Sequence, residues 1–537
     1  MRSPATRAKS VSLNFKGIFR PLSGQRISTL KKSAHPPMLN HGQVVRLIFG
    51  LKLRELRQER GLSPADLART CDVSVSYLNE IEKGKKYPKA DKILGLSQAL
   101  GVRYDQLTSL ELPRRLEPIA ELLNSKLLKE FPLEMYGLEP ARIVELIANA
   151  PAKMNAFIST IFEIARNYEM RQEHLFLAAL RSYQEMHDNY FEDLEQDVQA
   201  FVGSHQLHTA APFDLAQLER VLTQEYGYTL DRDTLGRHAV AAQARLRSVF
   251  QPKPRRLLLR PDLSRGQQAF VLGREVAFNY LKLVERPYVS SSTQVRSFDE
   301  VLNNFKASYF AGALLMEEES LLRDLRKVFS AKKWHPDLLL NLMTQYDVSP
   351  EMFMQRLTTL LPRHFGLQNL FFLRFDQTQA DAPYELTKEL HLARLHNPHG
   401  NELNEHYCRR WVSLRLLAEA RALPVPDTAA VPVTVAGAQK SRYFDTEDEY
   451  LCFTLARAGT PTQPALSVTV GLRCDEALRT QVRFLADPAL PFRIVNETCE
   501  RCPIVDCESR AAAPVEIVRQ AEREAFEAAV AELVQGS

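Results

Sequence analysis

The 537-residue sequence has no apolar run of about 18 residues or more, the length that a helix needs to cross a bilayer. It also lacks a strong charge of one sign, because 69 lysines and arginines stand against 65 aspartates and glutamates and leave a net charge of +4. A contact with nucleic acid must therefore be local rather than spread over the whole surface. We expect a cytoplasmic protein that makes no membrane contact.

Cysteine is scarce, with seven residues in all. An odd number of thiols in a chain without a secretory signal indicates a reducing compartment, where clustered thiols hold metal more often than they form disulfides. A glycine-rich phosphate loop is missing as well. Neither composition nor spacing therefore identifies a small-molecule ligand.

Acidic residues are absent from residues 1–37, which carry eight lysines and arginines. This composition is similar to that of a transit peptide, but the amphipathic stripe of such a peptide is missing. A disordered basic arm, or a start assigned too far upstream of Met38, explains the segment better.

Residues 44–110 carry the pattern of five short helices. Apolar residues recur at helical spacing from Val44 to Arg60, and Gly61 ends that helix. Ser63 caps a second helix, a third runs from Ser74 to Lys83, and two more follow. Five helices joined by short turns predict a compact all-α unit.

The segment from Ser63 to Gly84 resembles the helix-turn-helix of the Xre family, the class of the lambda-type repressors. The resemblance is most specific in the ending Ser-Tyr-Leu-Asn-Glu-Ile-Glu-Lys-Gly-Lys-Lys-Tyr-Pro. It implies a lambda-repressor-like fold and binding to a double-stranded DNA operator, with the third helix in the major groove. The residues expected at the DNA are Ser74, Val75, Ser76, Asn79, Glu80, Lys83, Lys85 and Lys86. A five-helix protein-binding module is the alternative.

These DNA-facing residues divide into two kinds. Val75, Ser76, Asn79 and Glu80 occupy base-facing positions by the resemblance, while the lysines follow where phosphates would lie. Glu80 is unfavourable near phosphates, so it either reads a cytosine amino group or faces solvent.

The rest of the chain mixes helices and strands. Residues 113–250 are rich in Leu, Ala, Glu and Arg and predict a helical spacer, with one or two long helices over Met170–Val202. The apolar face of the helical pattern at Met170–Val202 suits a packing scaffold or a dimer interface. Further patterns predict strands at Arg255–Arg260, Leu370–Phe375, Ala430–Val435, Tyr450–Leu455 and Leu466–Leu472, and helices at Gln267–Leu283, Val301–Leu315, Glu405–Ala422 and Val515–Val534.

Residues 268–278 resemble the zinc helix of ImmA/IrrE metallopeptidase-like domains, whose working motif is His-Glu-x-x-His. Here Arg274 and Phe278 take the histidine positions, and only Glu275 of the motif is present. The helix expected to supply a third ligand offers no carboxylate at residues 303–306. We therefore expect a degenerate domain and no catalytic residue.

Three thiols crowd the stretch Cys499-Glu-Arg-Cys502-Pro-Ile-Val-Asp-Cys507. A fourth ligand would complete a tetrahedral metal site or an iron–sulfur cluster, and Cys408 is the best candidate because it lies in the segment densest in His and Cys. We favour a [4Fe–4S] cluster, since four thiolates in a sensor domain suit a redox response. Zinc is the alternative, and ligation by His399 or His406 would favour it.

The order of these parts is similar to that of the short-chain fatty acyl transcriptional regulator family. The resemblance implies a multidomain protein with a helix-turn-helix domain at 41–112 after the arm at 1–40, a spacer at 113–250, a degenerate α+β domain at 251–360 and an α+β sensor domain at 361–537. It implies a homodimeric transcription regulator with a CoA thioester as its small-molecule effector. The alternatives are an ImmA/IrrE-type metalloprotease and a toxin–antitoxin or phage-immunity component.

Overall fold

The computed structural model describes residues 41–110, 172–238, 246–290, 295–379, 382–392, 405–423, 433–444, 446–460 and 463–535. The chain divides into two compact units, residues 1–111 and 112–537. The predicted arm at 1–40 and residues 113–171 of the predicted spacer lie outside the described residues. None of the helices in the described ranges is both long and apolar enough to cross a membrane.

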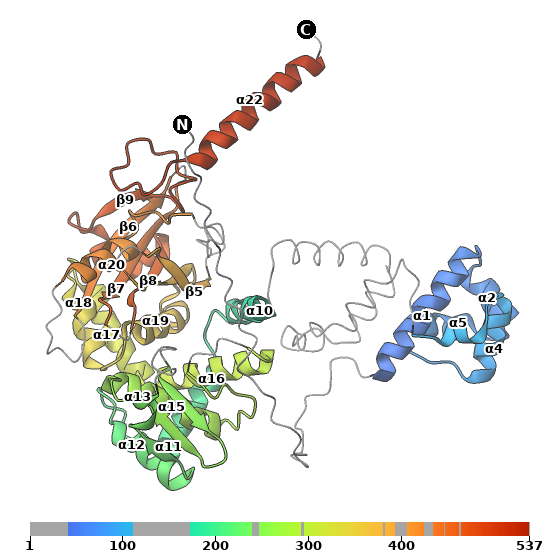
Figure 1. The fold of residues 1–537 in the computed structure, drawn as a ribbon, viewed down its shortest axis with the longest axis horizontal. Helices are drawn as coiled ribbons and strands as arrows, with labels where there is room; N and C mark the ends of the chain where they lie inside the picture. Colours follow the sequence, from blue (N-terminus) through green and yellow to red (C-terminus); the bar gives the residue numbers. More distant parts are fainter. Residues whose placement is uncertain are drawn as a thin grey trace, which may run out of the picture. The chain divides into compact units, whose positions relative to one another are not determined.

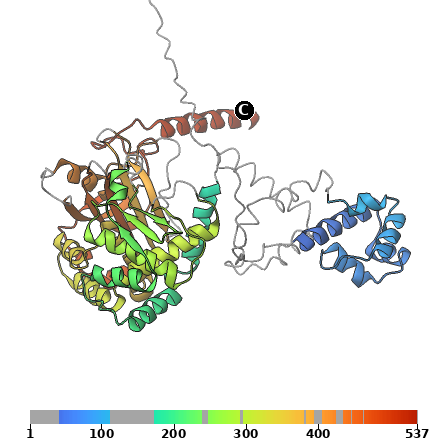
Figure 2. The same ribbon diagram turned by 60° about the horizontal axis from the view of Figure 1, so that its bottom comes forward.

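The first unit is a bundle of short helices, drawn in blue in Figures 1 and 2. Its helices are α1 (His41–Glu59), α2 (Pro64–Thr70), α3 (Val75–Glu82), α4 (Ala90–Ala99) and α5 (Tyr104–Thr108). Fully enclosed side chains such as Leu53, Leu78 and Ile81 form its core. Helix α1 passes very close to α3, because a Cβ on Gly50 would lie 2.3 Å from the carbonyl oxygen of Ile81.

The second unit begins, in the described residues, with helices that surround a small sheet. These elements are α10 (Gln172–Met186), α11 (Glu192–Ser204), α12 (Leu215–Arg220), η3 (Val221–Glu225), β1 (Thr229–Asp231), α13 (Thr234–Arg237), β2 (Ser248–Gln251), β3 (Arg256–Leu259), α15 (Arg265–Tyr280) and α16 (Phe298–Leu315). The three strands run in the order β1-β3-β2, with β1 parallel and β2 antiparallel to β3. Helices α15 and α16 pack against each other (Figure 1).

A larger mixed sheet follows. Its elements are α17 (Glu318–Ser330), α18 (Asp337–Gln345), α19 (Pro350–Phe365), β4 (Leu370–Gln377), β5 (Glu385–His391), α20 (Val412–Ala422), β6 (Thr434–Tyr443), β7 (Glu449–Arg457), β8 (Ala465–Arg473), α21 (Glu476–Gln481), η4 (Arg483–Ala486), β9 (Phe492–Val495) and α22 (Val515–Gln535). The strand order is β5-β4-β8-β7-β6-β9, and every pair is antiparallel except β6 with β9.

The two faces of this sheet are covered by different helices. Helices α18 and α19 pack on one face and α20 packs on the other. Gly437 of β6 makes room for α20, because a Cβ there would lie 2.7 Å from Cδ1 of Leu416. Since neighbouring residues of a strand point to opposite faces, Tyr450 and Cys452 face α20 while Phe453 and Leu455 join the other core.

The prediction of an all-α unit followed by an α+β region with mixed sheets is confirmed. Two details differ. The predicted spacer 113–250 is not only helical, because it contains β1 and the start of β2, and its helix α11 packs into the core of the following region. The helix predicted at Glu405–Ala422 begins only at Val412, because the preceding residues pair with the segment before Cys499, through a bridge between Tyr407 and Thr498.

Candidate DNA-binding helix and ligand sites

Helix α3 presents a short polar face at the surface of the first unit. Ser74 is its N-cap, and its hydroxyl accepts a hydrogen bond of 3.1 Å from the backbone N–H of Tyr77. Val75 and Ser76 are exposed in the first turn, and Asn79 lies one turn further on, half-buried. The sequence therefore places small side chains where the helix begins, which is the end that enters a major groove in helix-turn-helix proteins.

The cations that follow α3 lie close to its end. Lys83 is half-buried as the C-cap, and Lys85 and Lys86 are exposed beyond Gly84, whose φ of +68° ends the helix. Lys86 forms a surface ion pair of 2.8 Å with Glu80, and this contact raises the pKa of Lys86. Glu80 therefore has a partner in the protein itself, and its position on α3 does not require a contact with a DNA base.

An ion pair inside the first unit holds α3 against α1. Arg57 donates to both carboxylate oxygens of Glu82, from Nε at 2.6 Å and from Nη2 at 2.9 Å, and from Nη1 to the carbonyl oxygen of Leu62 at 2.8 Å. Both side chains are less than 10% exposed. The sequence pattern alone did not predict this pair, because the two residues lie 25 positions apart in the chain. Nothing in the local pattern distinguishes Glu82 from a glutamate exposed at the surface.

The peptidase-like segment holds a guanidinium beside the retained carboxylate. Glu275 accepts hydrogen bonds from Nη2 of Arg286 at 2.6 Å and from the hydroxyl of Tyr228 at 3.0 Å. Arg286 also stacks over the ring of Phe278, with 3.8 Å between guanidinium carbon and ring centroid. Glu275 is thus the buried partner of a cation, and this arrangement offers no open position for a water molecule that it could activate.

Three of the four predicted cysteine ligands lie near one another. Cys408, Cys499 and Cys502 are buried free thiols, and Cys507 is half-buried. Burial raises the pKa of the Cys408 thiol, and the neighbouring Cys499 and Cys502 add to this effect. The segments of Cys408 and Cys499 run side by side, because Cys408 N–H donates to the carbonyl oxygen of Glu497 at 3.0 Å and Cys499 N–H donates to that of His406 at 2.8 Å.

The loop that follows is fixed by one arginine. Arg510 donates to the carbonyl oxygens of Cys499 at 2.7 Å and Cys502 at 3.0 Å. His406 is occupied by Glu500, with 2.8 Å between Nδ1 and Oε1, and His399 lies outside the described residues. Within the described part of the chain, no three His, Cys, Asp or Glu side chains converge as ligands of a single metal ion.

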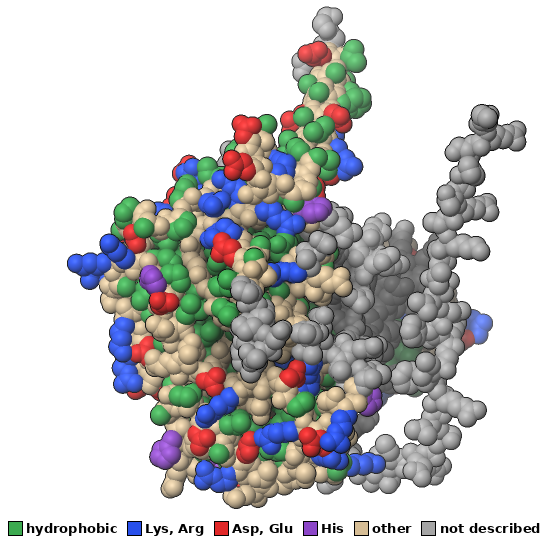
Figure 3. Space-filling model, turned by 60° about the vertical axis from the view of Figure 1, so that its left-hand side comes forward, with side chains coloured by type: hydrophobic (Ala, Val, Ile, Leu, Met, Phe, Trp, Pro, Cys, Tyr) green, Lys and Arg blue, Asp and Glu red, His purple; other side chains and the backbone are tan. Residues whose placement is uncertain are grey.

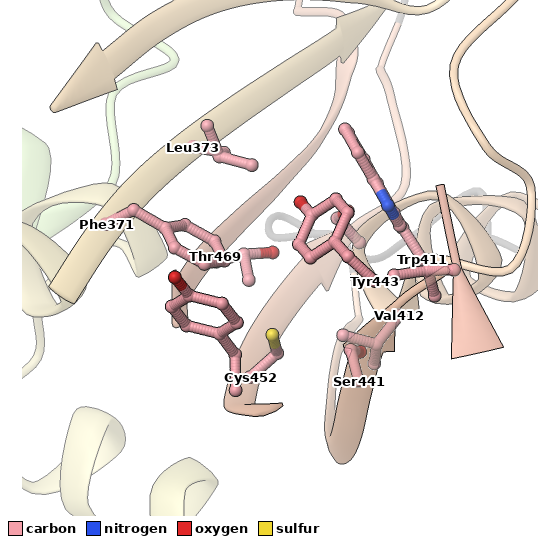
Figure 4. A pocket seen from close by; sticks show the side chains of 11 residues that line it. Phe371, Leu373, Trp411, Val412, Ser441, Tyr443, Cys452 and Thr469 are labelled. Atoms are coloured by element: carbon pink, nitrogen blue, oxygen red, sulfur yellow. The ribbon is translucent and has the colours of Figure 1, made fainter. Parts of the chain in front are cut away.

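A pocket lies between the sheet and the N-terminus of α20, and sequence reasoning did not anticipate it. Its cavity is small, about 20 Å³, which is room for about one water molecule, and it opens toward solvent. Figure 4 shows Tyr443 with Trp411, Cys452 and Thr469 around this space. The full lining is Phe371, Leu373, Trp411, Val412, Ser413, Ser441, Tyr443, Tyr450, Cys452, Thr469 and Val495.

Two polar atoms of the pocket lack partners. The indole Nε1 of Trp411 and the hydroxyl of Tyr450 are both enclosed and have no hydrogen-bond partner in the described structure. Burial raises the pKa of Tyr450 to about 12, so its hydroxyl is a neutral donor at physiological pH. Enclosed donors are nearly always hydrogen-bonded in proteins, and these two would be satisfied by an oxygen acceptor in the pocket. Tyr443 lies between the pocket and the cysteine segment, since it lines the pocket and Cys452 and Cys408 are among the neighbours that, after burial, raise its pKa.

Comparison with known proteins agrees with these features. A helix-turn-helix family model matches residues 53–107, and a model of the IrrE N-terminal-like domain matches residues 234–358. The chain is 24% identical over 501 residues to a propionyl-CoA carboxylase regulator of Cereibacter sphaeroides, covering 88% of this chain and 95% of the relative. It is 24% identical over 491 residues to the HTH-type transcriptional regulator PrpR of Mycobacterium tuberculosis, covering 87% and 92%.

The first unit has closer relatives. Control protein C.BamHI of Bacillus amyloliquefaciens is 38% identical over 60 residues, which are 11% of this chain and 74% of the relative. The long relatives are named as regulators, in agreement with the loss of the zinc-binding histidines. The chain therefore belongs to the Xre-type helix-turn-helix transcription regulators and carries an IrrE-like domain after its DNA-binding unit.

Proposed function

We propose that this regulator reads a specific operator through α3 and responds to a CoA thioester, or a related short acyl metabolite, bound in its C-terminal region. The observation that carries the effector proposal is the aromatic pocket with its two unpartnered donors. The name of the long Cereibacter relative, a propionyl-CoA carboxylase regulator, supports the same class of metabolite.

The DNA contacts in this proposal come from the exposed face of α3 and the cations after it. Ser76 and Asn79 are exposed or half-buried polar residues that can form hydrogen bonds to base edges, and Val75 can contact a thymine methyl group. Lys83, Lys85 and Lys86 supply phosphate contacts. Ser74 has a capping role in addition, since its hydroxyl accepts from Tyr77 N–H.

Replacing Ser76 and Asn79 by alanine is expected to erode sequence discrimination. Each lost base contact should cost about 1–3 kcal/mol on the correct operator and little on random DNA. The measurement is a binding titration on operator and scrambled duplexes at one fixed salt concentration. Equal losses on both duplexes would remove these residues from base recognition.

Replacing Lys85 and Lys86 by alanine should instead weaken binding to both duplexes alike. The slope of log affinity against log salt should fall by about one for each lost phosphate contact. An unchanged slope would show that these lysines do not contact phosphate.

The lining of the pocket matches a short acyl group with a carbonyl oxygen, although the cavity of about 20 Å³ must widen to admit one. Phe371, Leu373 and Val412 supply an apolar wall, while Trp411 and Tyr450 supply donors. The backbone of α20 begins beside the pocket, and a helix N-terminus favours an electronegative oxygen. A thioester combines these features, with an alkyl chain for the wall and a carbonyl oxygen for the donors.

Replacing Tyr450 by phenylalanine is expected to weaken thioester binding by about two- to tenfold, since one buried hydrogen bond contributes about 0.5–1.5 kcal/mol. The ligand-free protein should become no less stable, because the unpartnered hydroxyl is removed. The measurement is calorimetric titration with propionyl-CoA, acetyl-CoA and free CoA, together with thermal unfolding.

A matched control is Tyr346→Phe, which removes a hydroxyl that donates to Asp324 at 3.3 Å outside the pocket. That variant should lose stability and keep its affinity for thioesters. If Tyr450→Phe binds all three ligands as tightly as the wild type, the pocket is not the effector site.

We also propose that Cys408, Cys499, Cys502 and Cys507 bind a [4Fe–4S] cluster. All four are free thiols on segments tied together by backbone hydrogen bonds and Arg510. A single zinc ion needs all four sulfurs at about 2.3 Å from one point, whereas a cubane binds each thiolate on a different iron and tolerates wider spacing. We favour the cluster over zinc because a redox-active centre suits a sensor domain, and zinc is the alternative.

The regulator is further proposed to act as a homodimer, because lambda-type domains read two half-sites. Helix α22 offers a surface for it. Its exposed apolar side chains include Val518, Phe526 and Leu533 (Figure 3).

A further inference from the structure

The second unit contains a larger cavity that none of the sites above uses. It holds about 480 Å³, within the range of about 300–1,000 Å³ that is typical of small-molecule sites. Its lining comes from the end of α10, the loop that joins α10 to α11, the start of α11 and the C-terminal end of α19 with the residues after it. We call it the α10–α11 cavity. Its described lining shares no residue with the aromatic pocket.

Aromatic rings line the α10–α11 cavity. The ring centroid of His187 lies 4.7 Å from that of Tyr183 and 5.1 Å from that of Phe191, and the centroids of Tyr183 and Phe191 are 5.2 Å apart. Tyr190 is a further lining ring, and the guanidinium of Arg363 lies over it at 5.4 Å. A cation of the chain itself therefore already rests on an aromatic face of this cavity, which is the contact that ammonium groups also make with such rings.

Three carboxylates line the same cavity, and Arg363 is the one lysine or arginine of its described lining. Asp188 accepts a hydrogen bond of 3.4 Å from Nε2 of Gln368, and Glu192 lies 3.9 Å from Nη2 of Arg363. Asp193 is exposed and has no hydrogen-bond or ion-pair partner among the described residues. The lining thus holds more negative than positive charge, and this excess favours a cation as ligand.

The needs of the fold explain only part of this arrangement. Glu192 and Asp193 lie in the first turn of α11, where a helix favours acidic residues. Asp188 lies before that helix, and its φ is +48°, a conformation that aspartate and asparagine adopt more readily than most residues. The next residue fixes the loop to α19, because the buried side chain of Asn189 donates to Oγ1 of Thr358 at 2.9 Å. This bond holds the carboxylate of Asp188 at the cavity.

We propose that the α10–α11 cavity binds a small organic cation of the polyamine class. Aromatic faces attract ammonium groups, and carboxylates accept their N–H donors in charge-assisted hydrogen bonds. A polyamine carries several ammonium groups along one flexible chain, so one group can lie at the rings while another lies at the carboxylates. The site is independent of the proposed thioester, which would occupy the aromatic pocket.

Calorimetric titration of the full chain tests the proposal. Spermidine, putrescine and tetramethylammonium are titrated at constant ionic strength. Magnesium chloride is the control, because carboxylates bind this ion without help from aromatic rings. We expect saturable binding of at least one organic cation, and an unfolding midpoint that rises and levels off with its concentration. Magnesium should bind more weakly than spermidine.

Substitutions in the lining locate the site. Replacing Asp188 and Asp193 together by asparagine should weaken spermidine binding by about tenfold, because two carboxylate contacts with the cation are lost. Asparagine accepts the positive φ at position 188, so this variant should keep its fold. Tyr183→Leu removes a ring and should weaken binding by about two- to thirtyfold. Tyr183→Phe keeps the ring and should bind spermidine like the wild type.

A matched control lies outside the cavity. Asp233→Asn removes an exposed carboxylate that forms no capping hydrogen bond at α13, and it should leave spermidine binding unchanged. Three results would overturn the site. These are no saturable binding of any of the three organic cations, magnesium binding as tight as spermidine binding, and full spermidine affinity in the double asparagine variant. Binding of a lysine-rich peptide but of no free amine would also overturn it, and would indicate a protein partner instead.

Discussion

Replacing Glu82 by alanine is expected to remove about half of the stability of the helix-turn-helix unit and to weaken operator binding. The change leaves the Arg57 guanidinium buried without a counter-charge, and breaking a buried pair in this way costs about 3–5 kcal/mol. A unit of about 70 residues has about 4–10 kcal/mol of stability at about 0.05–0.15 kcal/mol per residue. Hydrogen exchange on the full chain should therefore show loss of amide protection in α1 and α3, while the second unit keeps its protection.

Two controls separate this effect from a change in DNA contacts. Glu80→Ala breaks only the exposed pair with Lys86 and should alter stability by less than about 1 kcal/mol. The double variant Arg57→Met with Glu82→Leu replaces the pair by apolar groups, which is often neutral or stabilising, and should restore protection. Full protection in Glu82→Ala would show that the pair does not hold α3 in place.

The second large effect is expected at the cysteines. Serine at Cys499 or Cys502 should abolish iron and sulfide binding in anaerobically purified protein, because each would remove one of four thiolate ligands. The segments that carry these cysteines should also lose their ordered structure when the cluster is absent. The free energy of binding such a centre contributes to the free energy of folding. Iron and sulfide analysis with absorption near about 400 nm provides the measurement.

The remaining cysteines are the matched controls. Cys452 is fully enclosed on β7, where burial raises its pKa to about 12, and it should behave as a packed apolar side chain. Cys452→Ser and Cys71→Ser are therefore expected to keep the cluster. A colourless protein with one zinc per chain would show that the site binds zinc and not a cluster. Full metal occupancy in Cys408→Ser would show that Cys408 is not a ligand.

Local signals predicted the first unit well. Ser63 caps α2 as expected, because its hydroxyl accepts from an N–H group that the helix leaves free. Ser74, which was expected to begin α3, is its N-cap in the same way. Glycines end α1, α3 and α4 at the expected positions because they accept positive φ. Such features depend on a few neighbouring residues, and the sequence contains all of them.

Boundaries in the second unit were predicted less well where tertiary pairing overrides local preference. Of the strand predicted at Ala430–Val435, residues 430–432 lie outside the described residues, and β6 begins at Thr434 and continues to Tyr443 because it pairs along its length with β7. The long helical pattern of Met170–Val202 is interrupted between α10 and α11. At Asp188 and Asn189 φ is positive, and Nδ2 of Asn189 donates to Thr358 at 2.9 Å.

The sites depend on contacts that no local pattern contains. The pair Arg57–Glu82 joins positions 25 residues apart, and the unpartnered donors of Trp411 and Tyr450 come from different elements. The pair Glu275–Arg286 joins α15 to the segment that follows it. Motif comparison located Glu275 but could not show that a guanidinium neutralises it. The same limit applies to the aromatic pocket, whose lining comes from five strands and the start of α20.

The most direct test of the account is selection of binding sites by the full chain from random double-stranded DNA, with and without propionyl-CoA. The account predicts one enriched pseudo-palindrome, with half-sites about 10 base pairs apart or a multiple of that spacing, and an affinity that the thioester changes. The variant with alanine at both Ser76 and Asn79 should not enrich this sequence. Recovery of no enriched sequence by the wild-type chain would contradict the assignment of α3 as an operator-reading helix.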